Sequence, residues 1–506
     1  MSTTQFIALL AATITAPAIF GDTCESLSKL ALPDTTVTRA ETVEAGAFPA
    51  PSAPPGQQAS FKSLPAFCRI AAELKPTADS DIKIEVWMPS ERWNGKFMGV
   101  GNGGWSGAIV YPALAMAVNR GYAAASTNTG HDGGDAAFAL GHPEKLADFG
   151  YRAVHEMTVK GKAIVAAFYS KVPERSYWNG CSSGGKQGLK EAQKFPRDYD
   201  GIVAGAPANY WTHLMIGDLW PAMATLANPA GFLPPAKLAI IHQAVLLACD
   251  NLDGVKDGLI EDPMNCHFDP GTLLCEDADT EGCLTAPQVE SARKIYGGAK
   301  NPRTGKQIFP GMTPGSELVW GALAGGPEPF RIPVSHFRYV VSKNKNWDYK
   351  TLDFDKDVAL ADKLDNGLLN ATDPNLKDFF ARGGKLLMYH GWNDQLISPL
   401  NSVNYYNTVA HKMGGVAKIN DSFRLFMAPG MNHCGGGDGP SRIDPVRAME
   451  GWVEQGKAPD KLLAAHPAAG NNIERTRPLC PFPQIAKYKG NGSIEDAANF
   501  VCASGK

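Results

Sequence analysis

Short strand-like runs alternate with helix-compatible segments on both sides of an irregular middle region. Residues 81–88 alternate apolar and polar side chains, which predicts a strand with one buried face. Short runs bounded by glycine and polar residues predict further strands at residues 96–100, 121–126, 175–179, 201–205, 385–390 and 423–427. Residues 151–170 have the length and composition of a helix. Strands that alternate with helices predict an α/β protein with a mainly parallel sheet.

The alternation stops between about Asn209 and Arg382, where prolines, four cysteines and clustered aromatic residues replace it. Because the core sheet needs the strands on both sides, we expect this segment to be inserted into one core rather than to form a tandem domain. The sequence therefore predicts a core of residues 22–206 and 384–506 and a lid of residues 207–383. Residues 45–60 are rich in Pro, Ala and Ser, and they are expected to form an irregular surface segment.

Length and charge narrow the classes of protein. The chain has 506 residues, which large α/β enzymes accommodate as one core plus insertions. Its formal net charge of −3 gives no support for nucleic acid or an acidic membrane surface as a partner. No internal apolar run is long enough to span a bilayer. The oligomeric state is not indicated by the sequence.

The first residues predict a secretory signal peptide. Residues 6–20 are an apolar stretch too short for a membrane helix, and small residues follow it, so cleavage is expected between Ala18 and Gly21. We assign residues 1–21 to this signal, although no Lys or Arg precedes the apolar stretch. The alternative is an N-terminal core helix.

The cysteines also indicate export. The ten cysteines form an even set after the proposed signal, and none lies in a CxxC motif, which disfavours zinc and thioredoxin chemistry. A secreted protein with disulfides is the simplest account. Asn370, Asn420 and Asn491 begin N-x-S/T sequons, which are glycosylation acceptors if the source is eukaryotic.

The stretch from Tyr177 to Leu189 carries the strongest functional signal. It contains Gly180-x-Ser182-x-Gly184, with an aromatic strand-like run before it and helix-compatible residues after it. This is the pattern of a nucleophile elbow, a sharp strand-to-helix turn that exposes a serine hydroxyl. Small flanking residues are needed because larger side chains would collide with the neighbouring strand and helix. We interpret Ser182 as a nucleophile; the alternative is an ordinary glycine-rich loop.

A serine nucleophile needs a base and an orienting carboxylate, which follow it in the order acid then histidine in α/β-hydrolases. Asp394 and His433 each lie just past a predicted strand end, and we predict them to be the acid and the base. His131 is a rival base, but it precedes the nucleophile and is expected to order a loop. His390 and Asp438 are expected to be structural. The predicted fold is an α/β-hydrolase core with a large inserted lid.

Cysteines lie beside both the nucleophile and the base. Cys181 precedes Ser182 and Cys434 follows His433, so the two cysteines come within disulfide reach if the serine and the histidine meet. Such a bridge would hold the elbow against the histidine loop; the alternative is that Cys181 is a small buried thiol.

Two N–H groups are needed to stabilise the negative charge that develops on the substrate oxygen. One is expected from Ser183, the residue after the nucleophile, and the other from the loop 101–104. We favour Gly104 for the second and leave Gly103 open.

This arrangement resembles the tannase and feruloyl esterase family, with the fungal feruloyl esterase B branch as the nearest match. The resemblance covers nearly all of the mature chain, through residues 101–104, 129–132, 151–156, 180–185, 390–394 and 433–434. It implies Ser182, Asp394 and His433 as the triad, with a Cys181–Cys434 bridge. It also implies the pairs Cys24–Cys68, Cys249–Cys266, Cys275–Cys283 and Cys480–Cys502, which spacing alone does not determine.

A run of carboxylates punctuated by glycines lies inside the predicted lid. Asp250, Asp253 and Asp257 suit a hard cation such as calcium, although their spacing is not that of an EF-hand, and a solvated acidic turn is the alternative. The family resemblance implies a structural calcium ion here, with main-chain carbonyls of Val255 and Leu259 completing its ligands.

The predicted function is that of a secreted serine carboxylesterase acting on hydroxycinnamoyl esters of plant cell-wall polysaccharides. A tannase that cleaves galloyl esters is the alternative within enzymes. A non-catalytic binding protein would be expected to have lost the nucleophile, acid or base, and all three are present. Some lid aromatic residues are expected to face the substrate, drawn from Trp211, Trp220, Phe232, Trp320, Phe330, Phe337, Tyr339 and Trp347.

Overall fold

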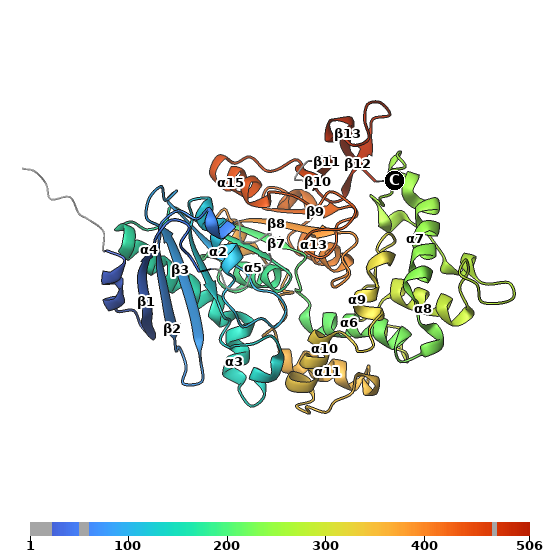
Figure 1. Ribbon diagram of the computed structural model, residues 1–506, viewed down its shortest axis with the longest axis horizontal. Helices are drawn as coiled ribbons and strands as arrows, with labels where there is room; N and C mark the ends of the chain where they lie inside the picture. Colours follow the sequence, from blue (N-terminus) through green and yellow to red (C-terminus); the bar gives the residue numbers. More distant parts are fainter. Residues whose placement is uncertain (1–22, 50–59, 468–472, 506) are drawn as a thin grey trace, which may run out of the picture.

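The computed structural model describes residues 23–49, 60–467 and 473–505, so the predicted signal peptide lies outside the described residues. The core is a nine-stranded sheet of order β1-β2-β3-β5-β4-β6-β7-β8-β9 (Figure 1). Its strands are β1 (Thr35–Val43), β2 (Phe67–Leu74), β3 (Ile82–Pro89), β4 (Lys96–Val100), β5 (Ala123–Thr127), β6 (Arg175–Cys181), β7 (Gly201–Gly205), β8 (Lys385–Gly391) and β9 (Phe423–Ala428). Strands β1, β2, β3 and β5 pair antiparallel in that order, and β5, β4, β6, β7, β8 and β9 pair parallel.

The seven predicted strands correspond to β3–β9, each within two residues at either end. Strands β1 and β2 were not expected. β1 is Thr-rich and largely exposed, so its pattern lacks the apolar run that marks a buried strand. The segment 45–60 is not entirely at the surface: Phe48 is buried and packs on Trp87, while residues 50–59 lie outside the described part.

Helices cover both faces of the sheet. The helices of the core are α2 (Tyr111–Asn119), α3 (Pro143–Ala147), α4 (Ala153–Tyr169), α5 (Ser183–Lys194), α13 (Leu400–Lys412), α14 (Val416–Ile419) and α15 (Pro445–Gln455). α4, α5 and α13 pack on one face and α2 and α15 on the other, and each layer buries its own apolar cluster. A mostly parallel sheet between two helical layers is the α/β-hydrolase architecture that the sequence predicted.

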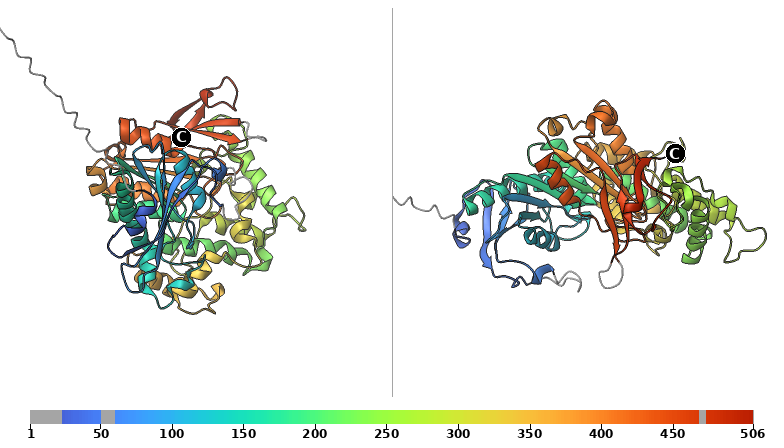
Figure 2. Two further views of the ribbon diagram at one scale, coloured as in Figure 1. Left: turned by 60° about the vertical axis from the view of Figure 1, so that its left-hand side comes forward. Right: turned by 90° about the horizontal axis from the view of Figure 1, so that it is seen from above.

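The segment between β7 and β8 adds no strand to the central sheet and is helical where regular. Its helices are α6 (Trp211–Thr225), α7 (Pro235–Cys249), α8 (Ala286–Gly297), α9 (Gly321–Ala324), α10 (Arg331–Ser335), α11 (Lys356–Asp365) and α12 (Lys377–Ala381). The lobe of α7 and α8 lies at one end of the molecule and the N-terminal strands at the other, as both Figure 1 and the right-hand view of Figure 2 show. Two apolar clusters hold this inserted segment together.

Two small hairpins follow the last helix. They pair β10 (Leu462–Pro467) with β11 (Ile473–Leu479), and β12 (Gln484–Tyr488) with β13 (Phe500–Ser504). All ten cysteines are paired in the five combinations that the family resemblance implied. Among the described residues, no helix is both long enough and apolar enough to cross a membrane.

Candidate active site

Ser182 occupies a strained turn between β6 and α5. Its φ of 63° and ψ of −123° lie in a region that L-residues rarely adopt. A Cβ atom on Gly180 would lie 2.6 Å from the carbonyl carbon of Gly184, and one on Gly184 would lie 3.0 Å from the Cα of Gly101. Side chains are therefore excluded at both positions, which is the steric reason for the GxSxG pattern.

His433 and Asp394 are hydrogen bonded to each other. The Nδ1 of His433 lies 2.7 Å from Oδ2 of Asp394, whose side chain has no exposed surface. The N–H groups of Leu396 and Ile397 donate to the other oxygen at 2.8 and 2.9 Å. Burial alone would raise the pKa of Asp394, but the charges and hydrogen bonds of His433 and His390 outweigh it and hold that pKa well below its usual range.

His390 shares the same carboxylate oxygen. Its Nε2 lies 3.0 Å from Oδ2 of Asp394, and its Nδ1 lies 2.7 Å from the hydroxyl of Ser402. The sequence predicted a structural role for His390, and the structure gives that role a place: the buried ring holds the carboxylate of Asp394 and is itself held by Ser402. Its position four residues before Asp394, at the end of β8, is the signal that would have suggested this contact.

The loop after β9 brings His433 to the elbow. The disulfide Cys181–Cys434, which we call the clamp disulfide, has a Cα–Cα distance of 6.0 Å and joins the neighbours of Ser182 and His433. The N–H of His433 donates to Oε1 of Gln395 at 3.0 Å. Ser182 and His433 line one pocket, but no hydrogen bond joins their side chains in the described part of the chain. The structure therefore gathers the three predicted triad residues at one site, with only the His433–Asp394 contact formed.

Ser183 and Gly104 face this pocket with free backbone N–H groups. Neither N–H has a hydrogen-bond partner among the residues that the structure describes. Both residues line the pocket, whereas Gly103 does not. The Ser183 hydroxyl donates to the Gly104 carbonyl at 2.9 Å, which fixes the two segments against each other. The geometry therefore favours Gly104 over Gly103 as the second donor to an oxyanion.

Two side chains hold the Gly104 loop: Gln187, which sequence reasoning passed over, and His131, which it expected to order a loop. Gln187 of α5 accepts from the N–H of Asn102 at 3.0 Å and donates to its side chain at 3.3 Å. His131, the rival base, is buried, and its Nε2 lies 2.9 Å from the carbonyl of Trp105, so it orders this loop. Burial lowers the pKa of His131, which keeps the ring neutral in this role. The position of Gln187, five residues after the nucleophile on α5, gave no local signal of that contact.

The pocket itself is apolar and narrow. Of the predicted lid aromatics, Trp211 and Phe330 line it, while Trp320, Phe337 and Trp347 belong to the buried interior of the lid. Its free volume is about 30 Å³, room for about two water molecules. An aromatic group can therefore enter only when side chains at the pocket wall turn aside.

The predicted calcium loop is partly neutralised by protein side chains. Asp257 forms an ion pair with Arg477, and Asp250 accepts from the N–H groups of Asp257 and Gly258. Burial raises the pKa of Asp253 to about 7, and the carboxylates of Asp257 and Asp250 add to that effect. The carboxylate oxygens suit calcium chemically, although one oxygen of Asp253 already accepts from the N–H of Val255 at 3.1 Å.

The loop has suitable ligand atoms for calcium, but these atoms are not gathered around one point. In the described part of the chain, the three aspartates are not among the acidic, His or Cys groups whose ligand atoms all lie within 4.8 Å of one another. A cation would have to draw them together and displace Arg477 from Asp257. Calcium binding through Asp250, Asp253 and Asp257 stays a prediction.

The three sequons differ in their surroundings. The side chains of Asn420 and Asn491 are exposed. The Asn370 side chain accepts from the N–H of Thr212 at 3.0 Å and donates to its hydroxyl at 3.1 Å, so the nitrogen that would carry a glycan is already held by Thr212. Glycosylation stays a prediction for all three.

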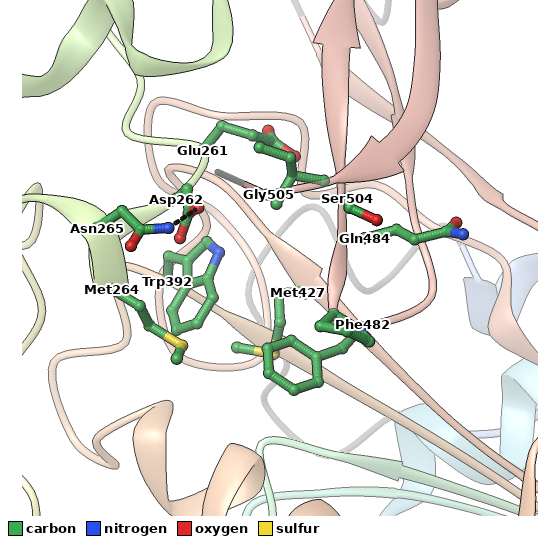
Figure 3. Close-up of a pocket in the computed structure, with 12 residues that line it drawn as sticks. Glu261, Asp262, Met264, Asn265, Trp392, Met427, Phe482, Gln484, Ser504 and Gly505 are labelled. Carbon is green, nitrogen blue, oxygen red and sulfur yellow. Dashed lines mark hydrogen bonds between the residues drawn. The ribbon is translucent and has the colours of Figure 1, made fainter. Parts of the chain in front are cut away.

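A larger cavity of about 310 Å³ lies away from the triad, between the lid and the C-terminal hairpins (Figure 3). Trp392, Met427, Met264 and Phe482 surround it, and Glu261 and Asp262 lie at one side. It contains no residue of the predicted triad. Its link to the site is Trp392, which lies two residues before Asp394.

Taken with the mostly parallel sheet, this constellation of side chains defines the class of protein as a carboxylic ester hydrolase of the α/β-hydrolase fold. Comparison with known proteins then gives the family. The family model described as tannase and feruloyl esterase matches residues 68–503, and the chain belongs to that family.

Three relatives illustrate the likeness. The chain is 39% identical to an uncharacterized esterase of Xanthomonas campestris pv. campestris, over 95% of this chain and 91% of that protein. It is 37% identical to a probable feruloyl esterase B-2 of Neosartorya fischeri, over 86% of each chain. The crystal structure of feruloyl esterase B from Aspergillus oryzae superposes with a TM-score of 0.89 at 34% identity, covering 95% of this chain and 99% of that one. The predicted family resemblance is confirmed, and the substrate is a small or polymer-linked ester.

Proposed function

We propose that this protein is a secreted feruloyl esterase that hydrolyses hydroxycinnamoyl esters of plant cell-wall polysaccharides through an acyl-enzyme on Ser182. The observation that carries the proposal is the 2.7 Å hydrogen bond between His433 and Asp394, on a loop joined by the clamp disulfide to the residue before Ser182. The names of the Neosartorya and Aspergillus relatives support the choice of substrate.

The chemistry follows from the positions of the side chains. Ser182 attacks the ester carbonyl while His433 accepts its proton, and Asp394 holds the ring so that the reacting nitrogen faces the serine. The N–H groups of Ser183 and Gly104 stabilise the tetrahedral oxyanion. His433 then gives its proton to the leaving alcohol and activates the water that hydrolyses the acyl-enzyme.

Export is supported by five disulfides, a number rare in cytosolic proteins. N-terminal sequencing of the protein recovered from the culture medium of its source tests this part. A mature chain that starts near Asp22 supports it, whereas retention of Met1 in a cell-associated protein contradicts it.

The enzymatic proposal is tested with methyl ferulate and methyl gallate. We expect higher kcat/KM on methyl ferulate, labelling of Ser182 by a serine-reactive phosphonate, and a loss of about 10⁶-fold in kcat in Ser182→Ala. Ser63→Ala, an exposed serine far from the site, is the matched control and should retain activity.

Three outcomes of this experiment contradict the proposal in different ways. Preference for methyl gallate would assign the protein to the tannase branch of the family. Turnover that survives in Ser182→Ala would remove Ser182 as the nucleophile. A folded wild-type protein that hydrolyses neither ester would leave only the broader class of ester hydrolase.

A further inference from the structure

Helix α6 places one acidic side chain in the wall of the substrate pocket. Trp211, Leu214, Met215 and Asp218 have the i, i+3, i+4, i+7 spacing of one helix face, and all four line the pocket. The first three are apolar or aromatic. Asp218 is 3% exposed and is the only acidic residue among those lining the pocket.

Asp218 has no protein partner in the part of the chain that the structure describes. No hydrogen bond or ion pair reaches its carboxyl group, although a buried carboxyl without a partner is costly. Burial raises the pKa of Asp218 well above its ordinary value, and the charge of nearby Asp394 adds to this. This shift favours the neutral acid, which can both donate and accept a hydrogen bond.

The distance along α6 is closer to the length of one class of acyl group than to that of another. Ala208, three residues before the start of α6, lies beside the nucleophile, since its N–H donates to the Ser182 carbonyl at 3.1 Å. The seven residues from Trp211 to Asp218 advance about 10 Å along the axis. In an extended 4-hydroxycinnamoyl group, standard bond lengths place the ring oxygen about 8 Å from the ester carbonyl carbon, against about 6 Å in a 4-hydroxybenzoyl group.

We propose that Asp218 receives the para-hydroxyl group of the acyl ring and so makes the enzyme selective for 4-hydroxycinnamoyl esters. This inference rests on the proposed function, because it requires that the acyl group enters the pocket between α6 and Ser182. The apolar residues of α6 contact the ring faces, and the carboxyl group of Asp218 exchanges hydrogen bonds with the hydroxyl group. A ring without that hydroxyl leaves the carboxyl buried and unpaired.

Wild-type enzyme tests the inference without any substitution. We expect kcat/KM for methyl 4-hydroxycinnamate to exceed that for methyl cinnamate and methyl 4-methoxycinnamate by about 10- to 100-fold. The shorter pair, methyl 4-hydroxybenzoate and methyl benzoate, should show no such preference, since that hydroxyl does not reach Asp218. Equal turnover of the three cinnamates overturns the inference.

Substitution then assigns the preference to Asp218. Asp218→Leu should bring the ratio of 4-hydroxycinnamate to cinnamate close to one, while Asp218→Asn, which keeps a donor and an acceptor, should retain a ratio above that of Asp218→Leu. Thermal melting and phosphonate titration give the fraction of folded, reactive enzyme in each variant. An unchanged ratio in Asp218→Leu overturns the inference, and if that variant does not fold, the wild-type ratios decide.

The two proposals fail in different ways. If the wild-type enzyme hydrolyses no cinnamate ester, the proposed function fails first. If it hydrolyses them without regard to the para-hydroxyl group, the proposed function stands and only the role of Asp218 is lost.

Discussion

Asp394 illustrates how much of this site depends on single hydrogen bonds. Four donors or potential donors converge on its two oxygens, from the N–H groups of Leu396 and Ile397 and the rings of His433 and His390. A buried carboxylate needs such partners, because an uncompensated charge in the interior is costly. Both histidine rings contact Oδ2 of Asp394, so His390 helps to position the oxygen atom that holds His433.

Lys186 is a second buried charge, one helical turn after Ser182, and it lacks such partners. Its Nζ atom lies 4.5 Å from the ring centroids of both Phe149 and Trp211, and no hydrogen bond reaches it. Burial lowers the pKa of Lys186 to about 7, although the two aromatic faces favour the charged form.

The low pKa of Lys186 predicts a pH dependence of stability. Between about pH 7 and the ordinary lysine pKa near 10.4, the unfolded chain binds more protons than the folded one, so the free energy of unfolding rises with pH. The slope from this group is at most about 1.4 kcal/mol per pH unit. Lys186→Met should remove that slope and raise the melting temperature at pH 7.

Thermal unfolding of both proteins from pH 6 to pH 10 checks this prediction. The control is Lys194→Met, on the exposed side of the same helix, which should keep the wild-type slope. A Lys186→Met protein with an unchanged slope, or one less stable at pH 7, would show that Lys186 is charged and held by the aromatic rings.

At the scale of elements, the clamp disulfide joins two turns that both have positive φ. Ser182 and Cys434 each have a φ of 63°, so neither turn is relaxed by itself. The bridge connects residues separated by 253 positions, and closing a loop of that length stabilises the fold by about 5.5 kcal/mol in the chain-entropy model. It also holds the nucleophile loop and the base loop at one distance.

Removing the clamp disulfide should therefore lower both stability and turnover. We expect Cys181→Ala with Cys434→Ala to lose at least ten-fold in kcat at a temperature where the protein remains folded, because misplacement of about 1 Å is costly in catalysis. Kinetics with methyl ferulate and far-ultraviolet circular dichroism measure the two effects.

The pair Cys24→Ala with Cys68→Ala is the matched control for this experiment. That bridge involves β2, four strands from β6 in the sheet, and closes a loop with a separation of 44 residues, which is stabilising by about 4 kcal/mol. Its removal should lower stability without lowering kcat. Equal kcat in the two double variants would mean that the clamp disulfide does not orient the site.

An element or a site residue can be predicted from the sequence when its signal is local, and it is missed when its role depends on contacts between distant segments. Ser182 was predictable because the steric demands of the elbow impose glycines at fixed spacing around it. The roles of Gln187 and Asp218 were not, because each comes from packing between segments far apart in the chain. Strand β1 escaped for a related reason: it pairs at the antiparallel edge of the sheet and buries little apolar surface. Strand β2 buries Phe67, Ile70 and Leu74, so its pattern was readable in the sequence and was missed.

At the scale of the whole molecule, the C-terminal hairpins brace the lid. Arg477 and Arg475 of β11 contact Asp257, and the N–H of Ala486 on β12 donates to Glu261 at 2.9 Å. The predicted calcium loop therefore lies where the lid meets the last strands of the chain, beside the larger cavity of Figure 3. All the predicted ligands lie in the lid, so an ion at this point would order the lid loop and leave the chemistry at Ser182 untouched.

Calcium removal should accordingly affect stability more than catalysis. We expect chelation to lower the melting temperature by several degrees while kcat, measured at once on methyl ferulate, stays within about two-fold. Asp253→Asn should abolish the response to added calcium, and Asp277→Asn, an exposed aspartate of the same lobe, should preserve it. A melting temperature that ignores both chelator and calcium would identify the loop as an acidic turn neutralised by Arg477.

The large sequence separation of the clamp disulfide affects when, during biosynthesis, the active site can be fully assembled. Its second cysteine is made only after most of the chain, and thiols stay reduced in the cytosol. If the protein is exported as proposed, the serine loop and the histidine loop remain unlinked during biosynthesis until the polypeptide reaches an oxidising compartment. Such timing would spare the esters of the producing cell. For recombinant production, a host with a reducing cytoplasm should be avoided.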